Sequence, residues 1–192
     1  MNKNLLIMVA VALVAVSSGY FLARAISPAD NGNQEWVGLP ESGGSQVPVT
    51  EGLLGQMRPD FTLHDTAGEV VSASDFDGHA WLVNFWATWC EPCVEEMPML
   101  SEVQRDFADK GVKVVGIALD DAERAREFAA NIGVEYPILV GKTDVVLAGR
   151  KFGNSTGALP FSVLVDDQGV IRWVRLGALK REELEKELLK IH

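Results

Sequence analysis

A nearly uninterrupted apolar run, residues 80–87 (AWLVNFWA), is followed closely by the only two cysteines of the chain, Cys90 and Cys93. Such a run is typical of a central strand in a parallel sheet, covered on both faces. Two cysteines at this spacing can close into a disulfide if the chain turns into a helix there. The positive end of that helix favours thiolate at Cys90, the more exposed of the two. The segment therefore predicts a buried strand that ends at a redox-active dithiol.

Two other roles for the cysteine pair are a structural disulfide and half of a zinc site. A disulfide that closes so short a loop removes little chain entropy from the unfolded state. Tetrahedral zinc needs four ligands, and no further cysteine or histidine pair lies at ligand spacing. His64, His79 and His192 are isolated and are expected at surface or turn positions. We therefore favour the redox pair and predict no metal.

The residues around the cysteines alternate between strand and helix patterns, which predicts an α/β fold. A hairpin is expected over 61–72 and a turn over 74–78, ahead of the apolar run. After it we expect a helix over 90–110, a strand over 112–119, a helix from Asp120 or Asp121 to 132, a strand over 137–140, a helix over 143–152 capped by Thr143 or Asp144, strands over 161–165 and 170–176, and a helix over 180–191. This order predicts a mixed sheet with helices on both faces. Cys90 then lies at the carboxyl end of a strand, where such sheets place their reactive sites.

The beginning of the chain predicts export. Residues 5–22 carry no charge and follow Lys3, and about 20 apolar residues suffice to span a bilayer. A signal peptide is the alternative, because Ala23-Arg24-Ala25 has the form of a cleavage site. Signal peptides usually have shorter apolar regions of about 7–15 residues, so an uncleaved anchor is favoured. Either assignment places the rest of the chain where disulfides persist.

The chain divides into an anchor or signal peptide (1–25), a flexible linker (26–57) and a folded domain (58–192). The linker is rich in Gly, Pro, Ser, Asn and Gln and has no periodic apolar pattern. We expect its Leu53 and Leu54 not to dock on the domain. The net charge of −10 argues against a nucleic-acid partner.

Three glutamates lie close to the cysteines in the sequence, and we expect them to differ in burial and in their effect on the thiols. Glu96 lies three residues after Cys93, on the apolar helix face that also carries Leu100, whereas Glu95 falls on a solvated face. A carboxylate on an apolar face is costly, and burial raises its pKa. Glu91 lies between the two cysteines and should oppose thiolate formation, which favours reducing chemistry.

Taken together, several motifs resemble those of thioredoxin-fold proteins of the TlpA/ResA/CcmG type, and the resemblance covers residues 58–192. The motifs are Pro59-Asp60-Phe61, Val83-Asn84-Phe85-Trp86-Ala87, Trp89-Cys90-Glu91-Pro92-Cys93, Glu96-Met97-Pro98 and Leu159-Pro160. The resemblance implies a thioredoxin-like fold with an N-terminal hairpin and an extra helix–strand unit near 121–140. It also implies a membrane-tethered, extracytoplasmic thiol–disulfide oxidoreductase.

The resemblance also suggests residue roles. Cys90 attacks the partner and Cys93 resolves the mixed disulfide, while Glu96 handles the proton of Cys93. Asn84 replaces the buried aspartate of thioredoxins and cannot relay a proton. Pro160 is expected in cis, facing the disulfide.

The remaining expected site residues surround the disulfide. The backbone of Leu159, next to Pro160, is expected to pair with the substrate chain. Trp89, Glu91 and Pro92 would form the rim or tune the thiols.

The function expected from these features is reduction of disulfides in exported proteins, with apocytochrome c as the client that the resemblance suggests. A membrane-embedded thiol electron donor would reduce the Cys90–Cys93 disulfide back to the dithiol on the periplasmic side. No organic cofactor is expected. A disulfide oxidase or isomerase is the alternative, disfavoured by Glu91. A peroxiredoxin would need proline at 83 and threonine at 87, where the chain has Val83 and Ala87. The non-enzymatic alternative is a copper- or peptide-binding thioredoxin-like module, of which copper capture would want wider cysteine spacing and a nearby histidine.

The anchor assignment predicts that the mature protein keeps residues 1–25 and sediments with membranes. N-terminal sequencing of the mature protein, purified from its own host, is the measurement. A mature chain that begins at Ile26 would contradict the anchor and support the signal peptide.

Overall fold

The computed structural model describes residues 52–191. The expected anchor, residues 5–22, and most of the expected linker lie outside this range. Within residues 52–191, no helix combines the length and the apolar character that a membrane crossing requires.

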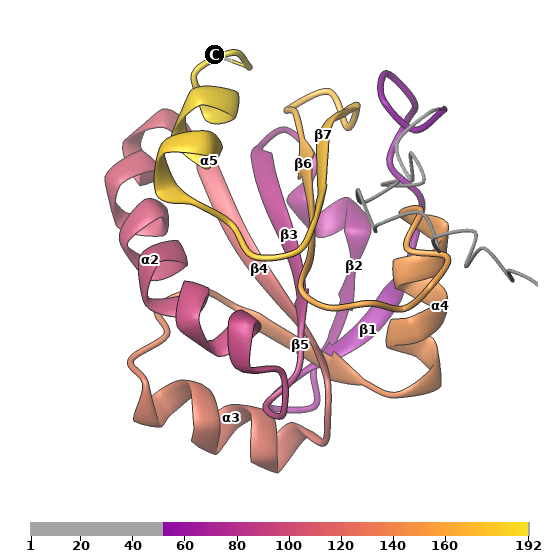
Figure 1. Cartoon of the computed structure of the whole chain (residues 1–192). Helices are drawn as coiled ribbons and strands as arrows, with labels where there is room; N and C mark the ends of the chain where they lie inside the picture. The colour runs from indigo at the N-terminus through magenta and orange to yellow at the C-terminus, as the bar shows by residue number, and fades with distance from the viewer. Residues whose placement is uncertain (1–51, 192) are drawn as a thin grey trace, which may run out of the picture. The chain divides into compact units, whose positions relative to one another are not determined.

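Seven strands form one mixed sheet in the order β2-β1-β5-β4-β3-β6-β7. The strands are labelled in Figure 1. The strands are β1 (Thr62–Asp65), β2 (Val70–Ser72), β3 (Ala80–Trp86), β4 (Val112–Leu119), β5 (Ile138–Gly141), β6 (Phe161–Val165) and β7 (Ile171–Leu176). Strands β3, β4 and β5 are parallel, and β1, β2, β6 and β7 add antiparallel pairs at the two sides. The mixed sheet predicted from the strand–helix order is confirmed.

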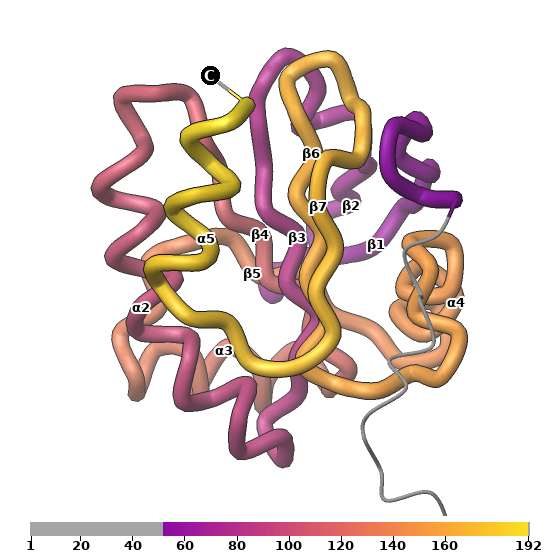
Figure 2. The backbone as a smooth tube through the Cα atoms, turned by 45° about the horizontal axis from the view of Figure 1, so that its top comes forward, coloured from indigo at the N-terminus to yellow at the C-terminus, as the bar shows by residue number. Residues whose placement is uncertain are grey.

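Helices cover both faces of this sheet (Figures 1 and 2). Within residues 52–191 the helical segments are η1 (Ala73–Phe76), α2 (Glu91–Phe107), η2 (Ala108–Lys110), α3 (Ala122–Asn131), α4 (Thr143–Lys151) and α5 (Arg181–Leu188). One apolar core lies between the sheet and α2, α3 and α5. A second core lies on the opposite face, under α4 and η1.

Strand β3 lies inside the sheet between β4 and β6, and all seven of its residues are buried. Val83 pairs with Val115 of parallel β4 on one side and with Val163 of antiparallel β6 on the other. Because side chains alternate along a strand, Trp86 enters the core under α2 while Trp81 enters the core under α4. The strand ends at Trp86, four residues before Cys90.

The expected helix–strand insertion is α3 with β5. Strand β5 pairs in parallel with β4 and antiparallel with β1. The N-terminal hairpin of β1 and β2 therefore joins the sheet through the inserted strand. Gly133 follows α3 with a φ of 72°, the left-handed conformation that commonly ends a helix at glycine.

Two sequence expectations about element ends are corrected. The N-cap of α4 is Lys142, not Thr143 or Asp144. Asp144 lies inside the first turn, where its Oδ1 accepts hydrogen bonds from the N–H groups of Lys142 (2.7 Å) and Val145 (3.0 Å). The last helix ends at Leu188 rather than Ile191, and two tight turns follow it.

The structure also corrects the expectation that Leu53 does not dock. Leu53 is half-buried against the core under α4, whereas Leu54 is exposed. Gly55 N–H donates to the carbonyl of Ile171 (2.8 Å), and Ile171 N–H donates to the carbonyl of Gln56 (2.9 Å). The ordered contacts of the domain therefore begin several residues before Arg58, because edge strand β7 offers backbone groups for pairing.

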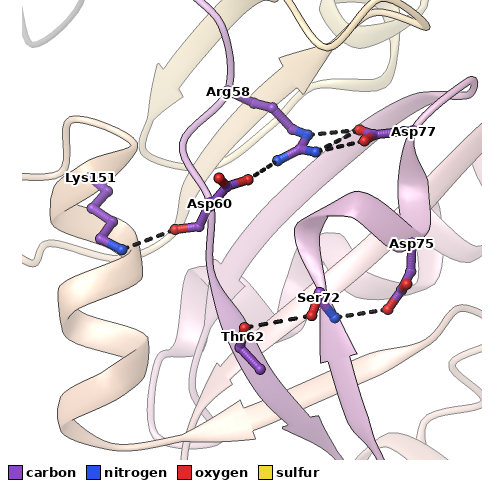
Figure 3. A network of polar contacts seen from close by, with 7 residues as sticks. All are labelled: Arg58, Asp60, Thr62, Ser72, Asp75, Asp77 and Lys151. Atoms are coloured by element: carbon purple, nitrogen blue, oxygen red, sulfur yellow. Dashed lines mark hydrogen bonds and ion pairs between the residues drawn. The ribbon is translucent and has the colours of Figure 1, made fainter.

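Arg58 connects this incoming chain to the turn before β3, as Figure 3 shows. Its guanidinium donates to both carboxylate oxygens of Asp77 (2.7–2.9 Å) and to Asp60 Oδ1 (2.7 Å). The Arg58 side chain is only 8% exposed, although Asp60 is almost fully solvated. Lys151 of α4 adds a bond from its Nζ to the carbonyl of Asp60 (3.0 Å).

We expect Arg58→Ala to lower the free energy of unfolding by about 1–3 kcal/mol, because it removes charge-assisted hydrogen bonds from a largely buried side chain. Urea denaturation measures the effect. Lys151→Ala is the matched control at an exposed position, where the expected change is below about 0.5 kcal/mol. Equal effects of the two substitutions would contradict this account.

Candidate redox site

Cys90 and Cys93 form a disulfide at the start of α2, with their Cα atoms 5.3 Å apart. Cys90 is the N-cap of the helix, and its carbonyl accepts hydrogen bonds from the N–H groups of Cys93 (3.0 Å) and Val94 (3.1 Å). Cys93 is fully buried, while 6% of Cys90 is exposed. Cys90 is thus the more accessible of the two cysteines, as expected.

Glu96 is buried beneath the disulfide, one helical turn after Cys93, with only 4% of the residue exposed. Its Oε1 accepts a hydrogen bond from Asn84 Nδ2 (2.7 Å), and its Oε2 accepts one from the N–H of Leu179 (2.6 Å). Burial raises the pKa of Glu96 to about 7, and these two donors oppose the rise because they stabilise the carboxylate. The buried position predicted from the helical spacing is therefore observed.

Asn84 lies on β3, where its Nδ2 also donates to Ser162 Oγ (3.0 Å) on the neighbouring strand β6. Its Oδ1 accepts no hydrogen bond from the described residues. Rotating the Asn84 side-chain amide by half a turn would exchange its nitrogen and oxygen. The oxygen could then accept hydrogen bonds from a protonated Glu96 carboxyl and from the Ser162 hydroxyl. Asn84 can therefore form a hydrogen bond with Glu96 whether Glu96 is ionised or protonated, although Asn84 cannot carry the proton itself.

The residues expected at the rim of the site differ in exposure. Trp89 is 67% exposed, and Glu91 and Pro92 are exposed at the first turn of α2. Leu159 is half-buried and Pro160 is buried, and the peptide bond between them is cis. The cis bond implied by the resemblance is thus present ahead of β6.

Sequence reasoning missed Asp120 as a site residue and considered it only as a helix cap. Its carboxylate accepts hydrogen bonds from the N–H and the hydroxyl of Thr88, two residues before Cys90. The sequence signal that could have identified Asp120 as a site residue was its position at the carboxyl end of β4, beside the end of β3. The N–H of Leu179 could not have been found, because it is a backbone group brought to Glu96 by the fold.

Within residues 52–191 no group of three or more histidine, cysteine or acidic side chains is arranged to hold a metal ion. The site contains a disulfide, a buried carboxylate and the hydrogen-bond partners of that carboxylate. This set supports exchange of thiols and disulfides, with a group beneath Cys93 that can take up or release a proton near neutral pH.

A cysteine pair at the start of a helix after the central strand, with a cis proline ahead of the adjacent strand, defines a thioredoxin-like thiol–disulfide oxidoreductase. Comparison with known proteins agrees with this class. The chain belongs to the AhpC/TSA family, which matches residues 54–174.

Two relatives and one solved structure are similar to this chain. The chain is 36% identical to the thioredoxin-like protein YneN of Bacillus subtilis, over 70% of this chain and 78% of YneN. It is 32% identical to the thiol-disulfide oxidoreductase ResA of Geobacillus kaustophilus, over 72% of this chain and 78% of ResA. A crystal structure of a thioredoxin family thiol:disulfide interchange protein from Chlorobium tepidum has a TM-score of 0.63 and 27% identity, over 71% of this chain and 96% of that one.

The raised pKa of Glu96 predicts a specific dependence of stability on pH. Between about pH 4.5 and pH 7 the folded protein keeps Glu96 protonated while the unfolded chain ionises it, so stability falls as pH rises through this window. Relative to Glu96→Gln, the wild type should lose about 3 kcal/mol between pH 4 and pH 8. Urea denaturation of the oxidised proteins measures this difference.

Glu95→Gln is the matched control, because Glu95 is the exposed neighbour on the same helix. It should keep the pH dependence of the wild type. Parallel stability curves for the wild type and Glu96→Gln would show that Glu96 does not titrate in this window.

Proposed function

We propose that the protein reduces disulfide bonds in exported proteins, using the Cys90–Cys93 dithiol as its electron source. The observation that carries this proposal is the buried carboxylate of Glu96 one turn below Cys93. Residues three apart on a helix are neighbours, with Cβ atoms about 5–6 Å apart. A carboxyl group with a pKa of about 7 exchanges its proton readily at the pH at which the thiols react.

The proposed reaction has two exchange steps. The Cys90 thiolate attacks one sulfur of the client disulfide, so a mixed disulfide forms and the other client sulfur leaves as a thiolate. Cys93 then gives its proton to Glu96 and attacks Cys90, which releases the second client sulfur. The client gains two electrons, and its thiolates take up two protons. The enzyme is left with the Cys90–Cys93 disulfide that the structure shows.

Two features near Cys90 support the reducing direction and a polypeptide client. Glu91 adds a negative charge to the first turn of the helix, which disfavours a Cys90 thiolate and therefore a strongly oxidising pair. Trp89 is a large exposed apolar side chain next to Cys90. An exposed apolar side chain of this kind suits contact with an unfolded client.

The site of action is also part of the proposal. The uncharged stretch 5–22 supports a single-pass anchor in the cytoplasmic membrane, with the catalytic domain on the periplasmic side. A membrane-embedded thiol electron donor would then return the enzyme to its reduced form. The resemblance to the TlpA/ResA/CcmG type favours apocytochrome c as a client.

The reductase proposal predicts a reduction potential closer to that of thioredoxin, about −270 mV, than to the roughly −120 mV of a strong oxidant. Equilibration of the Cys90–Cys93 pair with glutathione or dithiothreitol buffers measures this potential. A strongly oxidising value would overturn the proposed direction and favour a disulfide oxidase.

Cys93→Ala should arrest the mixed disulfide on Cys90 and so trap clients in cells. Trapped exported proteins, apocytochrome c among them, would support the proposal. Cys90→Ala is the matched control and should trap none of them at this site, because its remaining thiol is fully buried.

A further inference from the structure

A single buried carboxylate connects the carboxyl end of β4 to the turn that carries Cys90. Residues 87–90 form this turn, closed by a hydrogen bond from Cys90 N–H to the carbonyl of Ala87 (3.1 Å). Thr88 lies inside the turn, and both its hydroxyl (2.5 Å) and its N–H (3.2 Å) donate to Asp120 Oδ2. The side chain of Asp120 is only 3% exposed.

Asp120 is itself held in place from the other side. Its Oδ1 accepts the N–H of Asp121 (3.1 Å) and lies 3.4 Å from a guanidinium nitrogen of Arg124. Its backbone forms an isolated bridge with Gly141 at the end of β5. The Asp120 carboxylate is therefore held by groups outside the 87–90 turn. The turn is connected to this carboxylate through Thr88.

We propose that Asp120 is a positioning residue for thiol–disulfide exchange: through Thr88 it holds the 87–90 turn so that Cys90 stays within reach of Cys93. The reaction closes a disulfide only when the two sulfurs meet, so the closure constant depends on how well they are held together. Cys93 is fixed within α2, whereas Cys90 is the N-cap, where the helix meets the turn. Loosening the turn frees mainly Cys90, and this lowers the effective concentration of one sulfur at the other.

This inference rests on exchange at Cys90 and Cys93, and not on the reducing direction proposed above. The wild-type potential tests the direction, whereas comparison of variants with the wild type tests Asp120. Either proposal can therefore fail without the other.

The test is the equilibrium constant for closing the Cys90–Cys93 disulfide, measured in glutathione redox buffers. Thr88→Val keeps the shape of the side chain and the charge of Asp120 but removes the hydroxyl donor. We expect it to lower the constant about three- to tenfold, which is less than the full value of one hydrogen bond to a charged group, because part of that value is common to the oxidised and reduced proteins. Thr88→Ser is the matched control, because it keeps the donor, and it should stay within about twofold of the wild type.

Asp120→Ala removes both bonds to Thr88 and should lower the closure constant at least as much as Thr88→Val. Adding Thr88→Val to Asp120→Ala should change the constant no further, because the partner is already gone. If Asp120→Ala fails to fold, the two Thr88 variants still decide the question.

A merely structural role gives a different result. Thr88→Val would then lower the melting temperatures of the oxidised and reduced proteins equally and leave the closure constant unchanged. That outcome overturns the proposal. A larger loss of stability in the oxidised form, together with a lower closure constant, supports it.

Discussion

The burial of β3 on both faces is the constraint on which the rest of the domain depends. A strand with neighbours on each side and helices above and below cannot shift without exposing large apolar side chains. Its register therefore determines where Asn84 meets Glu96 and where the chain leaves the sheet toward Cys90. The position of the reactive pair therefore follows from a strand that is buried along its whole length.

The buried carboxylate of Glu96 brings together three parts of the chain that are distant in sequence. Helix α2 supplies the carboxylate, β3 supplies the amide of Asn84, and the connection before α5 supplies the N–H of Leu179. Burial opposes the charge and the two donors favour it. The balance leaves the group able to titrate near neutrality, which neither a solvated glutamate nor a fully ion-paired one would do.

Most of the domain could be predicted from sequence because its signals are local. The buried run before Cys90, the helical spacing of Glu96 with Leu100, and glycine at the end of α3 each depend on neighbouring residues. The contacts that could not be predicted from the sequence join segments that are far apart along the chain. Thr88 and Asp120 meet because β3 and β4 end side by side, and Leu53 docks because β7 is an edge strand. Neither pairing leaves a periodic pattern in the chain.

The pairing of Gly55 and Gln56 with Ile171 has a consequence for self-association. An open strand edge is a template on which other chains, including unfolded ones, can add a strand and aggregate. Here the incoming chain occupies the start of β7, and the charged side chains of Arg172 and Arg175 lie farther along the same strand. The opposite edge, β2, is only three residues long. The domain thus leaves an unfolded chain little sheet edge on which to nucleate.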